Sequence, residues 1–339
     1  MRGGISDMEE IITLDYGSGG EKTSELIHSI LLPLFDNPAL APLGDGAILS
    51  GQEPLAFSTD SFVVTPWRFP GGDIGKLAVC GTVNDLCMTG AVPRYLSFSL
   101  ILEEGFPVNA LREIAASAAA QARQDGVRIV TGDTKVVERG KGDGIYINTA
   151  GIGFLRASGL GQDTIKKGDA ILLSGCAGCH GAAVLMARAG LADAGGPVSD
   201  CGSLLEVSQA ALSAGAIRIM RDPTRGGVAT VLAEFAEGTP LTMELWEAAV
   251  PVDPAVAASC GLLGLDPLYS ACEGRMVAIA APEDAEAVLA AMRQAPGGEQ
   301  AAIVGEVTDR YPGSAVLNTA LGGRRLLPRL TGAQLPRIC

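Results

Sequence analysis

Residues 76–91, KLAVCGTVNDLCMTGA, decide the fold class of this chain, because their pattern predicts a helix between two apolar strands. The strand before this helix is expected at residues 54–59 and the strand after it at residues 95–102. A second helix is predicted over residues 109–124, where Leu111, Ile114, Ala115, Ala118 and Ala122 share one face. Further strands are expected at residues 127–131 and 145–154. These elements make the first half of the chain a unit of mixed helices and strands.

The second half has the same mixed character and begins after a plausible linker at residues 156–161, RASGLG. Strands are predicted at residues 170–174 and 276–280, and helices at residues 181–189, 204–214, 227–237 and 283–292. Neither half shows the strict β-α-β rhythm and early glycine fingerprint of a dinucleotide-binding fold. We therefore predict an α+β protein with two domains, residues 1–155 and 156–330, and a tail over residues 331–339.

Composition and charge narrow the range of functions. The chain has 339 residues, of which 47% are apolar, and its net charge is −13, from 25 Lys and Arg against 38 Asp and Glu. An acidic chain without a Lys- or Arg-rich run is a poor binder of nucleic acid or anionic membranes. No apolar run approaches the ~18 residues of a membrane span, and the first ten residues lack the apolar core of a signal peptide. We expect a cytoplasmic protein whose eight cysteines are reduced.

Several aspartates of the first half are expected at strand ends or in turns bounded by glycine. Carboxylates at several strand ends can converge on one cleft, and Mg²⁺ is usually held by one or two carboxylates together with phosphate oxygens and water. Each aspartate taken alone could equally be a turn residue or a helix cap. As a set they point to a metal–phosphate site, and the candidate ligands are Asp45, Asp60, Asp85 and Asp133.

Two glycine-rich turns could hold phosphate groups. A helix N-terminus offers unpaired N–H groups and the positive end of a dipole, and glycines let a phosphate approach the backbone. Neither turn is a Walker A sequence, and either could simply be a flexible entry to a helix. The candidate nucleotide-binding residues in these turns are Gly17, Gly19 and Gly20 before one apolar segment, and Asp222, Gly226 and Gly227 before another.

Lys135 and Glu273 are candidate proton-transfer groups. Lys135 follows Asp133 by two residues, and Glu273 lies between an apolar turn and the predicted strand at residues 276–280. A partly buried carboxylate near an ammonium group can have a pKa suited to a general base. The alternative for either residue is an ordinary surface charge at a strand edge.

The segment Cys176-Ala177-Gly178-Cys179-His180 matches the pattern of a c-type haem attachment site. Attachment of haem to such a motif normally accompanies export, and no export signal is present, so this interpretation is disfavoured. A redox pair at a helix start, where thiolates are favoured, is a second interpretation. Ordinary packing is the third and the preferred one.

The chain ends in Pro336-Arg337-Ile338-Cys339, which places a thiol beside the terminal carboxylate. The residues before it show no apolar period, and we expect a mobile arm over residues 331–339. Such an arm could span roughly 30 Å when extended. From the tail alone, Cys339 could be either a reactive group on this arm or an accidental cysteine in a frayed end.

Taken together, these segments resemble the HypE family of carbamoyl dehydratases, which belongs to the superfamily named for aminoimidazole ribonucleotide synthetase (PurM-like). The resemblance covers almost the whole chain. Tyr16 departs from the pattern, since relatives often have His there, and the cysteines of residues 176–180 replace a usually more acidic loop. The segments that carry the resemblance are residues 58–66, 69–91, 131–153 (TGDTKVVERGKGDGIYINTAGIG), 220–230 (MRDPTRGGVAT), 266–276 and 335–339.

The resemblance implies a two-domain PurM-like fold and a homodimer whose N-terminal sheets form a shared barrel. It implies ATP and Mg²⁺ in the cleft between the domains. It also implies hydrogenase maturation as the function: Cys339 receives a carbamoyl group from HypF, and ATP-dependent dehydration gives a thiocyanate. The cyanide then passes to iron on a complex of HypC and HypD. Glu273 is expected to be the base, assisted by Lys135. The aspartates expected near the phosphates are Asp45, Asp60, Asp85, Asp133 and Asp222.

Three other functions remain possible from the sequence. Another ATP-using enzyme of the superfamily would share the cleft, but thiamine-monophosphate kinase needs no terminal thiol. Selenophosphate synthetase usually has a reactive residue near the N-terminus, whereas the first cysteine here is Cys80. A non-catalytic assembly adaptor would use its tail as a docking peptide without ATP turnover. A thiol-redox protein would use Cys176 and Cys179 as a reversible disulfide.

Overall fold

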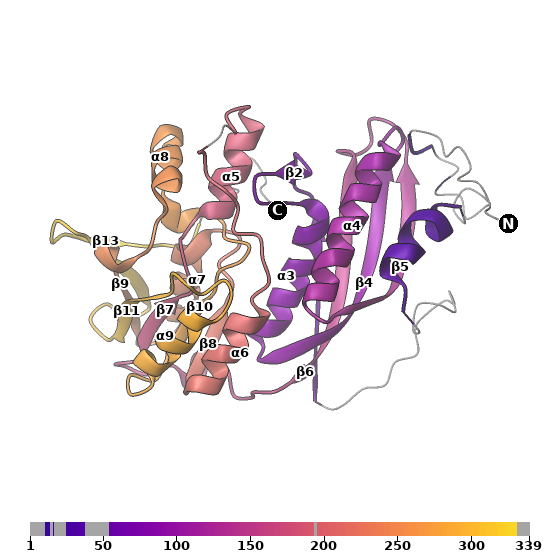
Figure 1. Ribbon diagram of the computed structural model, residues 1–339. Helices are drawn as coiled ribbons and strands as arrows, with labels where there is room; N and C mark the ends of the chain where they lie inside the picture. Colours follow the sequence, from indigo (N-terminus) through magenta and orange to yellow (C-terminus); the bar gives the residue numbers. More distant parts are fainter. Residues whose placement is uncertain (1–10, 14–15, 17–24, 38–53, 193–194, 331–339) are drawn as a thin grey trace.

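The computed structural model describes residues 11–13, 16, 25–37, 54–192 and 195–330, and these build two sheets with helices packed on them (Figure 1). The first sheet has the strand order β1-β6-β4-β5. Strands β4 and β5 are parallel, and the other neighbours are antiparallel. The four strands are β1 (Leu55–Phe62), β6 (Ile145–Leu155), β4 (Ala91–Glu103) and β5 (Arg128–Val137).

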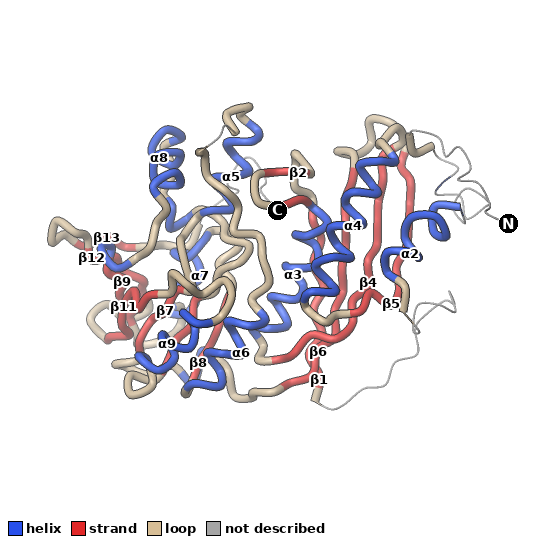
Figure 2. The backbone as a smooth tube through the Cα atoms, in the orientation of Figure 1, coloured by secondary structure: helices blue, strands red, loops and turns tan. Residues whose placement is uncertain are grey.

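Helices α3 (Ile74–Met88) and α4 (Val108–Gln124) cover one face of this sheet (Figures 1 and 2). The alternation of side chains along β4 explains the packing, since Leu96, Phe98, Leu100 and Leu102 are all buried. The other elements near this sheet are short: the π-helix Ile27–Leu31, α2 (Leu32–Phe35), and the paired strands β2 (Arg68–Phe69) and β3 (Gly72–Asp73).

The opposite face of this sheet is left open by the described helices. We call it the open face, and it carries Phe57, which is 65% exposed and pairs with Ile152 of β6. Leu55 of β1 and Ile101 of β4 are also exposed apolar residues on this face. Large apolar side chains exposed to water on a sheet face favour a covering partner.

The second sheet has the strand order β13-β12-β9-β11-β7-β10-β8 and is largely antiparallel, with β9 and β12 as its parallel pair. Its strands are β7 (Ala170–Leu173), β8 (Ile217–Arg221), β9 (Thr242–Trp246), β10 (Val277–Ala280), β11 (Ala302–Thr308), β12 (Ser314–Asn318) and β13 (Arg324–Leu326). The helices of this half are α5 (Cys179–Arg188), α6 (Leu205–Ala214), α7 (Gly227–Ala236), α8 (Pro254–Leu263) and α9 (Ala285–Gln294). Single 3-10 turns lie at Gln162–Thr164, Glu247–Ala249 and Pro267–Tyr269.

The seven-stranded sheet is packed on both faces, as its continuous apolar runs require. Leu172 of β7 belongs to a core shared with α6 and α9, whereas Leu173 belongs to a core shared with α7. The first of these cores continues into the N-terminal half, and α6 packs against α3. The two sheet layers are therefore joined through helices rather than edge to edge (Figure 2).

The predicted α+β architecture is confirmed, with shifts of several residues at element ends. The helix expected at residues 76–91 runs from Ile74 to Met88, because the Asp73 side chain accepts hydrogen bonds from the Gly75 and Lys76 N–H groups and caps it. Five strands and one helix of the second half were not predicted from the sequence: β8, β9, β11, β12, β13 and α8. No helix within the described ranges is long and apolar enough to cross a membrane.

Candidate active site

Asp60 and Asp85 are brought together where β1 packs against α3. Asp60 lies opposite the buried Thr149 of β6 and is therefore on the helix-covered face of the sheet. Two residues earlier on β1, the Ser58 hydroxyl donates a hydrogen bond of 2.7 Å to the Asp85 carboxylate. The Ser61 N–H donates a hydrogen bond of 2.7 Å to Asp60 Oδ1. The strand and the helix thus present two carboxylates side by side.

Asp222 adds a third carboxylate, from the C-terminal domain, directly after β8. Burial and the negative charge of Asp85 raise its pKa to about 7, and Asp60 contributes to the same effect. Burial likewise raises the pKa values of Asp60 and Asp85. We call these three residues the acidic cluster. Carboxylates that raise one another's pKa are stabilised by a cation placed among them.

Glu273 lies between the turn Pro267–Tyr269 and β10, and it is 3% exposed. Burial raises the pKa of its carboxyl well above the ordinary value. The neighbouring Cys201 thiol and the negative charges of Asp222 and Asp200 raise this pKa further. A buried carboxyl that is electrostatically linked to a carboxylate cluster is a typical candidate for an acid–base group.

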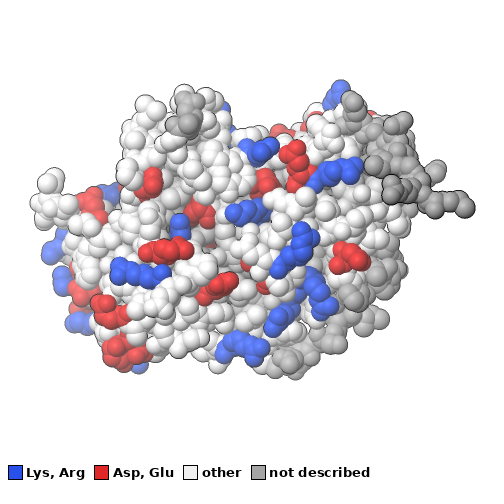
Figure 3. All heavy atoms as spheres, in the orientation of Figure 1, with Lys and Arg blue, Asp and Glu red and all other residues white. Residues whose placement is uncertain are grey.

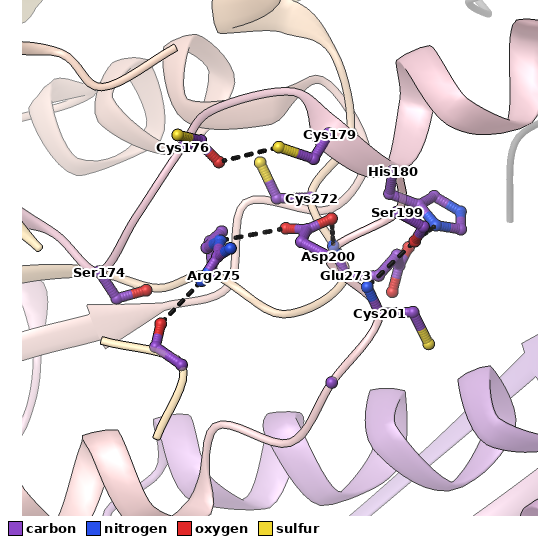
Figure 4. Close-up of polar contacts among 12 residues, drawn as sticks. Ser174, Cys176, Cys179, His180, Ser199, Asp200, Cys201, Cys272, Glu273 and Arg275 are labelled. Atoms are coloured by element: carbon purple, nitrogen blue, oxygen red, sulfur yellow. Dashed lines mark hydrogen bonds and ion pairs between the residues drawn. The ribbon is translucent and has the colours of Figure 1, made fainter. Parts of the chain in front are cut away.

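The backbone of Glu273 is held by the segment before α6 (Figure 4). Asp200 Oδ1 accepts a hydrogen bond of 3.2 Å from the Glu273 N–H, and the Gly202 N–H donates one of 3.2 Å to the Glu273 carbonyl. The Arg275 guanidinium lies 3.7 Å from the buried Asp200 carboxylate. Figure 4 shows the Asp200 carboxylate between the Arg275 guanidinium and the Glu273 backbone.

Gly226 and Gly227 form the turn that opens α7, and both have positive φ, +82° and +61°. A side chain at Gly227 would approach the Leu268 carbonyl oxygen to 2.5 Å, so packing alone requires glycine there. The first turn of α7 also holds the Thr230 hydroxyl, which is buried and has no hydrogen-bond partner among the residues that the structure describes. A buried unpaired hydroxyl at a helix N-terminus fits an anionic ligand at this position.

Asp133 and Lys135 lie away from the acidic cluster, on the other edge strand of the sheet. They form an exposed ion pair of 2.7 Å on β5, and Lys135 holds the pKa of Asp133 below its usual value. Asp133 pairs with Ser99 on the open face, and β6 and β4 separate β5 from β1. Within one chain, therefore, Asp133 and Lys135 do not join the acidic cluster.

The expectation that these aspartates lie at strand ends or in turns is wrong for three of them. Asp60 lies inside β1, Asp85 inside α3 and Asp133 inside β5. Successive residues of a strand face opposite sides of the sheet, so position within the strand decides which face a carboxylate reaches. Only Asp222 follows directly after a strand.

Among the residues that the structure describes, no three His, Cys, Asp or Glu side chains are close enough to hold a metal ion by themselves. The acidic cluster instead fits the usual Mg²⁺ arrangement, in which one or two carboxylates share the ion with phosphate. The metal-ligand assignment of Asp45, Asp60, Asp85 and Asp133 stays a prediction. Five predicted site residues lie outside the described part of the chain: Gly17, Gly19, Gly20, Asp45 and Cys339.

Cys176 and Cys179 are buried free thiols. Burial raises the pKa of Cys179 to about 12, which disfavours the reactive thiolate. His180 is fully buried; its Nδ1 lies 2.8 Å from the Ser199 hydroxyl, and its ring packs edge-on against Phe69. This environment supports the packing interpretation over a haem or redox site.

Sequence reasoning missed several residues that build the site. Ser58 and Thr230 are short hydroxyl residues with no distinguishing local pattern, and Asp200 lies in an irregular segment. Asn84 could have been suspected, because it directly precedes Asp85 on the helix that decided the fold.

Comparison with known proteins shows the family to which this chain belongs. The family model described as AIR synthase related protein, N-terminal domain, matches residues 43–155, and the corresponding C-terminal domain model matches residues 166–318. The carbamoyl dehydratase HypE of Bradyrhizobium diazoefficiens is 48% identical, over 97% of this chain and 96% of that protein. The chain belongs to the HypE family. The HypE of Escherichia coli is 46% identical, over 97% of this chain and 99% of its own length.

Solved structures of HypE proteins have the same fold as this chain. A HypE in complex with ATP has a TM-score of 0.93 at 50% identity, covering 96% of this chain and 99% of that chain. A HypE–HypF complex matches with a TM-score of 0.77 at 43% identity, covering 90% of this chain and 99% of the matched one. Thiamine monophosphate kinase from Aquifex aeolicus, at 16% identity, shares the fold alone. The predicted family, the PurM-like fold and the enzyme class are thereby confirmed.

Proposed function

We propose that this protein matures [NiFe]-hydrogenase by ATP-dependent dehydration of a carbamoyl group carried on Cys339, giving a thiocyanate that supplies cyanide to iron. The proposal depends on the environment of Glu273. Its carboxyl is buried at the domain boundary, and the charges of the acidic cluster help to raise its pKa. The 48% identity to a carbamoyl dehydratase over nearly the whole chain supports it. A non-catalytic adaptor would need no such buried acid.

The ATP site lies between the acidic cluster and the N-terminus of α7. Asp60, Asp85 and Asp222 would share Mg²⁺ with the phosphates, and the unpaired Thr230 hydroxyl and the turn at Gly226 would face the anion. A related HypE binds ATP in a solved complex. Mg·ATP supplies the phosphoryl group that turns the carboxamide oxygen into a good leaving group.

Glu273 acts as the general base in this proposal. Formation of C≡N requires removal of protons from the carbamoyl nitrogen as the oxygen leaves, and a base must receive them. Burial among other carboxylates raises the pKa of Glu273, which makes its carboxylate form a stronger base. Cys339 acts as the carrier that presents the carbamoyl group and needs no strongly activated thiolate.

A homodimer completes the proposed site. Lys135 is expected to assist Glu273, yet it lies on β5, at the sheet edge away from β1 and on the open face. It can reach an active site only if a second copy supplies it. Pairing of two open faces into a shared barrel would also bury Leu55, Phe57 and Ile101.

The proposed partners are HypF as carbamoyl donor and the HypC–HypD complex as cyanide acceptor, with the cytoplasm as location. A related HypE is seen in a complex with HypF. On the face drawn in Figure 3, several Lys and Arg side chains lie near one another below the centre, and Asp and Glu lie around them. The net charge of −13 argues against a nucleic-acid partner.

The Glu273→Gln variant tests the base assignment. Incubated with HypF, carbamoyl phosphate and Mg·ATP, the variant should still be carbamoylated at Cys339 but should not form thiocyanate. A conservative change at a remote exposed acid, Asp309→Asn, provides the control and should leave both steps intact. Normal thiocyanate formation by Glu273→Gln would remove Glu273 from this role.

A further inference from the structure

The side chain of Asn84 links the two domains at the active site. Asn84 belongs to α3 of the N-terminal domain and is 1% exposed. Its hydrogen bonds go to the C-terminal domain: Oδ1 accepts from the Leu204 N–H at 2.8 Å, and Nδ2 donates to the Gly202 carbonyl at 3.0 Å. A longer contact of 3.4 Å runs from Nδ2 to the Glu273 carbonyl. One buried amide therefore contacts both segments that surround the proposed base.

Residues 200–204 and the loop of Glu273 also hold each other in place. Asp200 and Gly202 bind the Glu273 backbone at its N–H and at its carbonyl, each at 3.2 Å. A side chain at Gly274 would overlap the Asp200 carbonyl oxygen. The two chain segments are therefore packed backbone against backbone at this point. The position of Glu273 is thus set by residues 200–204, and residues 200–204 are held by Asn84.

Asn84 is also the neighbour of Asp85 in the same turn of α3. The helix that carries one carboxylate of the acidic cluster therefore also carries the anchor of the Glu273 loop. We propose that Asn84 is a positioning residue that sets the Glu273 carboxyl at its working distance from the acidic cluster across the domain boundary. This inference rests on the proposed role of Glu273 as base.

The expected effect is on the chemical step rather than on ATP binding. Among the described residues, the Asn84 amide hydrogen-bonds only to Gly202, Leu204 and Glu273, so it faces the loop of Glu273 and not α7. A misplacement of about 1 Å between reacting groups can slow a reaction by about a hundredfold. Asn84→Ala should therefore lower kcat for dehydration by about tenfold to a hundredfold and change the KM for ATP by less than about threefold.

The test uses full-length protein that HypF has first carbamoylated on Cys339. Thiocyanate formation is then followed after addition of Mg·ATP, for Asn84→Ala and for the matched control Gln121→Ala. Gln121 is a buried amide of α4 in the same domain, and it hydrogen-bonds Asp125 at 3.0 Å. The control should keep a wild-type rate. A rate within twofold of wild type for Asn84→Ala, or an equal loss in Gln121→Ala, overturns the inference.

Two further variants separate this inference from the base assignment. If Asn84 acts only through Glu273, any residual thiocyanate formation by Glu273→Gln should be the same in the double variant Asn84→Ala/Glu273→Gln, and a further loss in the double variant overturns the inference. If Glu273→Gln forms no thiocyanate and Asn84→Ala forms it at the wild-type rate, the proposed function stands and the positioning role of Asn84 is excluded. If Glu273→Gln forms thiocyanate at the wild-type rate, both are excluded. Should Asn84→Ala fail to fold, the isosteric Asn84→Asp, which lacks the amide donor, must show the same loss of kcat.

Discussion

The Tyr269 hydroxyl donates a hydrogen bond of 3.0 Å to the Pro328 carbonyl, which fixes the last described segment of the chain beside the turn that leads to Glu273. The next residue, Arg329, forms ion pairs of 3.1 and 2.7 Å with Glu234 and Glu237 at the end of α7. The proposed carrier arm of residues 331–339 thus follows a segment that is held at a defined point on the C-terminal domain. A fixed starting point raises the effective concentration of Cys339 at the site.

Removing this anchor should slow delivery of the carbamoyl group without affecting its loading. The double variant Tyr269→Phe/Arg329→Ala should be carbamoylated normally, and its dehydration rate should fall by about threefold to tenfold, because exposed contacts contribute only about 1 kcal/mol. The control is Lys167→Ala, which breaks an exposed ion pair of 2.8 Å with Asp309 in the same domain. Equal rates for the double variant and wild type would show that the anchor plays no part.

The acidic cluster should make the ligand-free protein more stable at mildly acidic pH. Because the folded-state pKa of Asp222 is raised from 3.8 to about 7, its contribution to stability is fully present below 3.8 and is lost as pH rises through 7. The unfolding temperature should therefore fall between pH 5.5 and 8, and Asp222→Asn should make this fall shallower. Asp309, whose pKa is lowered by Lys167, titrates below this window, so Asp309→Asn should leave the slope unchanged.

The unfolding temperature measured with Mg·ATP tests the role of Asp222 in ligand binding. Asp222→Asn should lose most of the stabilisation that Mg·ATP gives the wild type, because one carboxylate of the cluster is gone. Retention of both the steep pH dependence and the full Mg·ATP stabilisation in Asp222→Asn would contradict the assignment of the cluster.

The sequence was informative where local pattern decides structure. The helix carrying Asp85 and the first part of the strand carrying Asp60 could be predicted from their apolar periodicity, and the turn at Gly226 from its glycines. Asp133 was predicted near the phosphates, but the alternation of side chains along β5 places its carboxylate on the open face, beside Lys135. Which face a strand residue occupies depends on register with its neighbours, and one sequence does not reveal that register.

The missed parts of the site depend on contacts between distant residues. Asn84 bonds to Gly202 and Glu273, which are 118 and 189 residues away. Nothing in the local sequence around Asn84 indicates where its amide points. The strands β8, β9, β11, β12 and β13 are short, and short apolar runs are ambiguous between helix and strand until the sheet is assembled.

The open face predicts the oligomeric state. Phe57→Glu places a charge among the exposed apolar residues of the open face and should convert a dimer of 34.6 kDa chains into a monomer, as measured by light scattering after size-exclusion chromatography. Leu262→Glu on α8, where the leucine is 70% exposed, is the matched control and should remain dimeric. A Phe57→Glu dimer, or a monomeric wild type, would exclude the shared barrel.

Cys176 and Cys179 should be dispensable for catalysis. Cys176 and Cys179 are buried with raised pKa values, so Cys176→Ala/Cys179→Ala should keep wild-type rates of thiocyanate formation to within about threefold, apart from any loss of stability. Alkylation of the native protein at pH 8 should leave both thiols unmodified in the wild type. Loss of activity that parallels formation of a reversible disulfide would instead favour the redox interpretation.

The mass of the C-terminal peptide tests the central claim most directly. The full-length protein is incubated with HypF, carbamoyl phosphate and Mg·ATP, and the peptide ending in Cys339 is then weighed. The account predicts carbamoylation of Cys339 followed by ATP-dependent loss of one water, and no modification in Cys339→Ala. An unmodified Cys339, or the same mass changes in a peptide of Cys339→Ala, would contradict it.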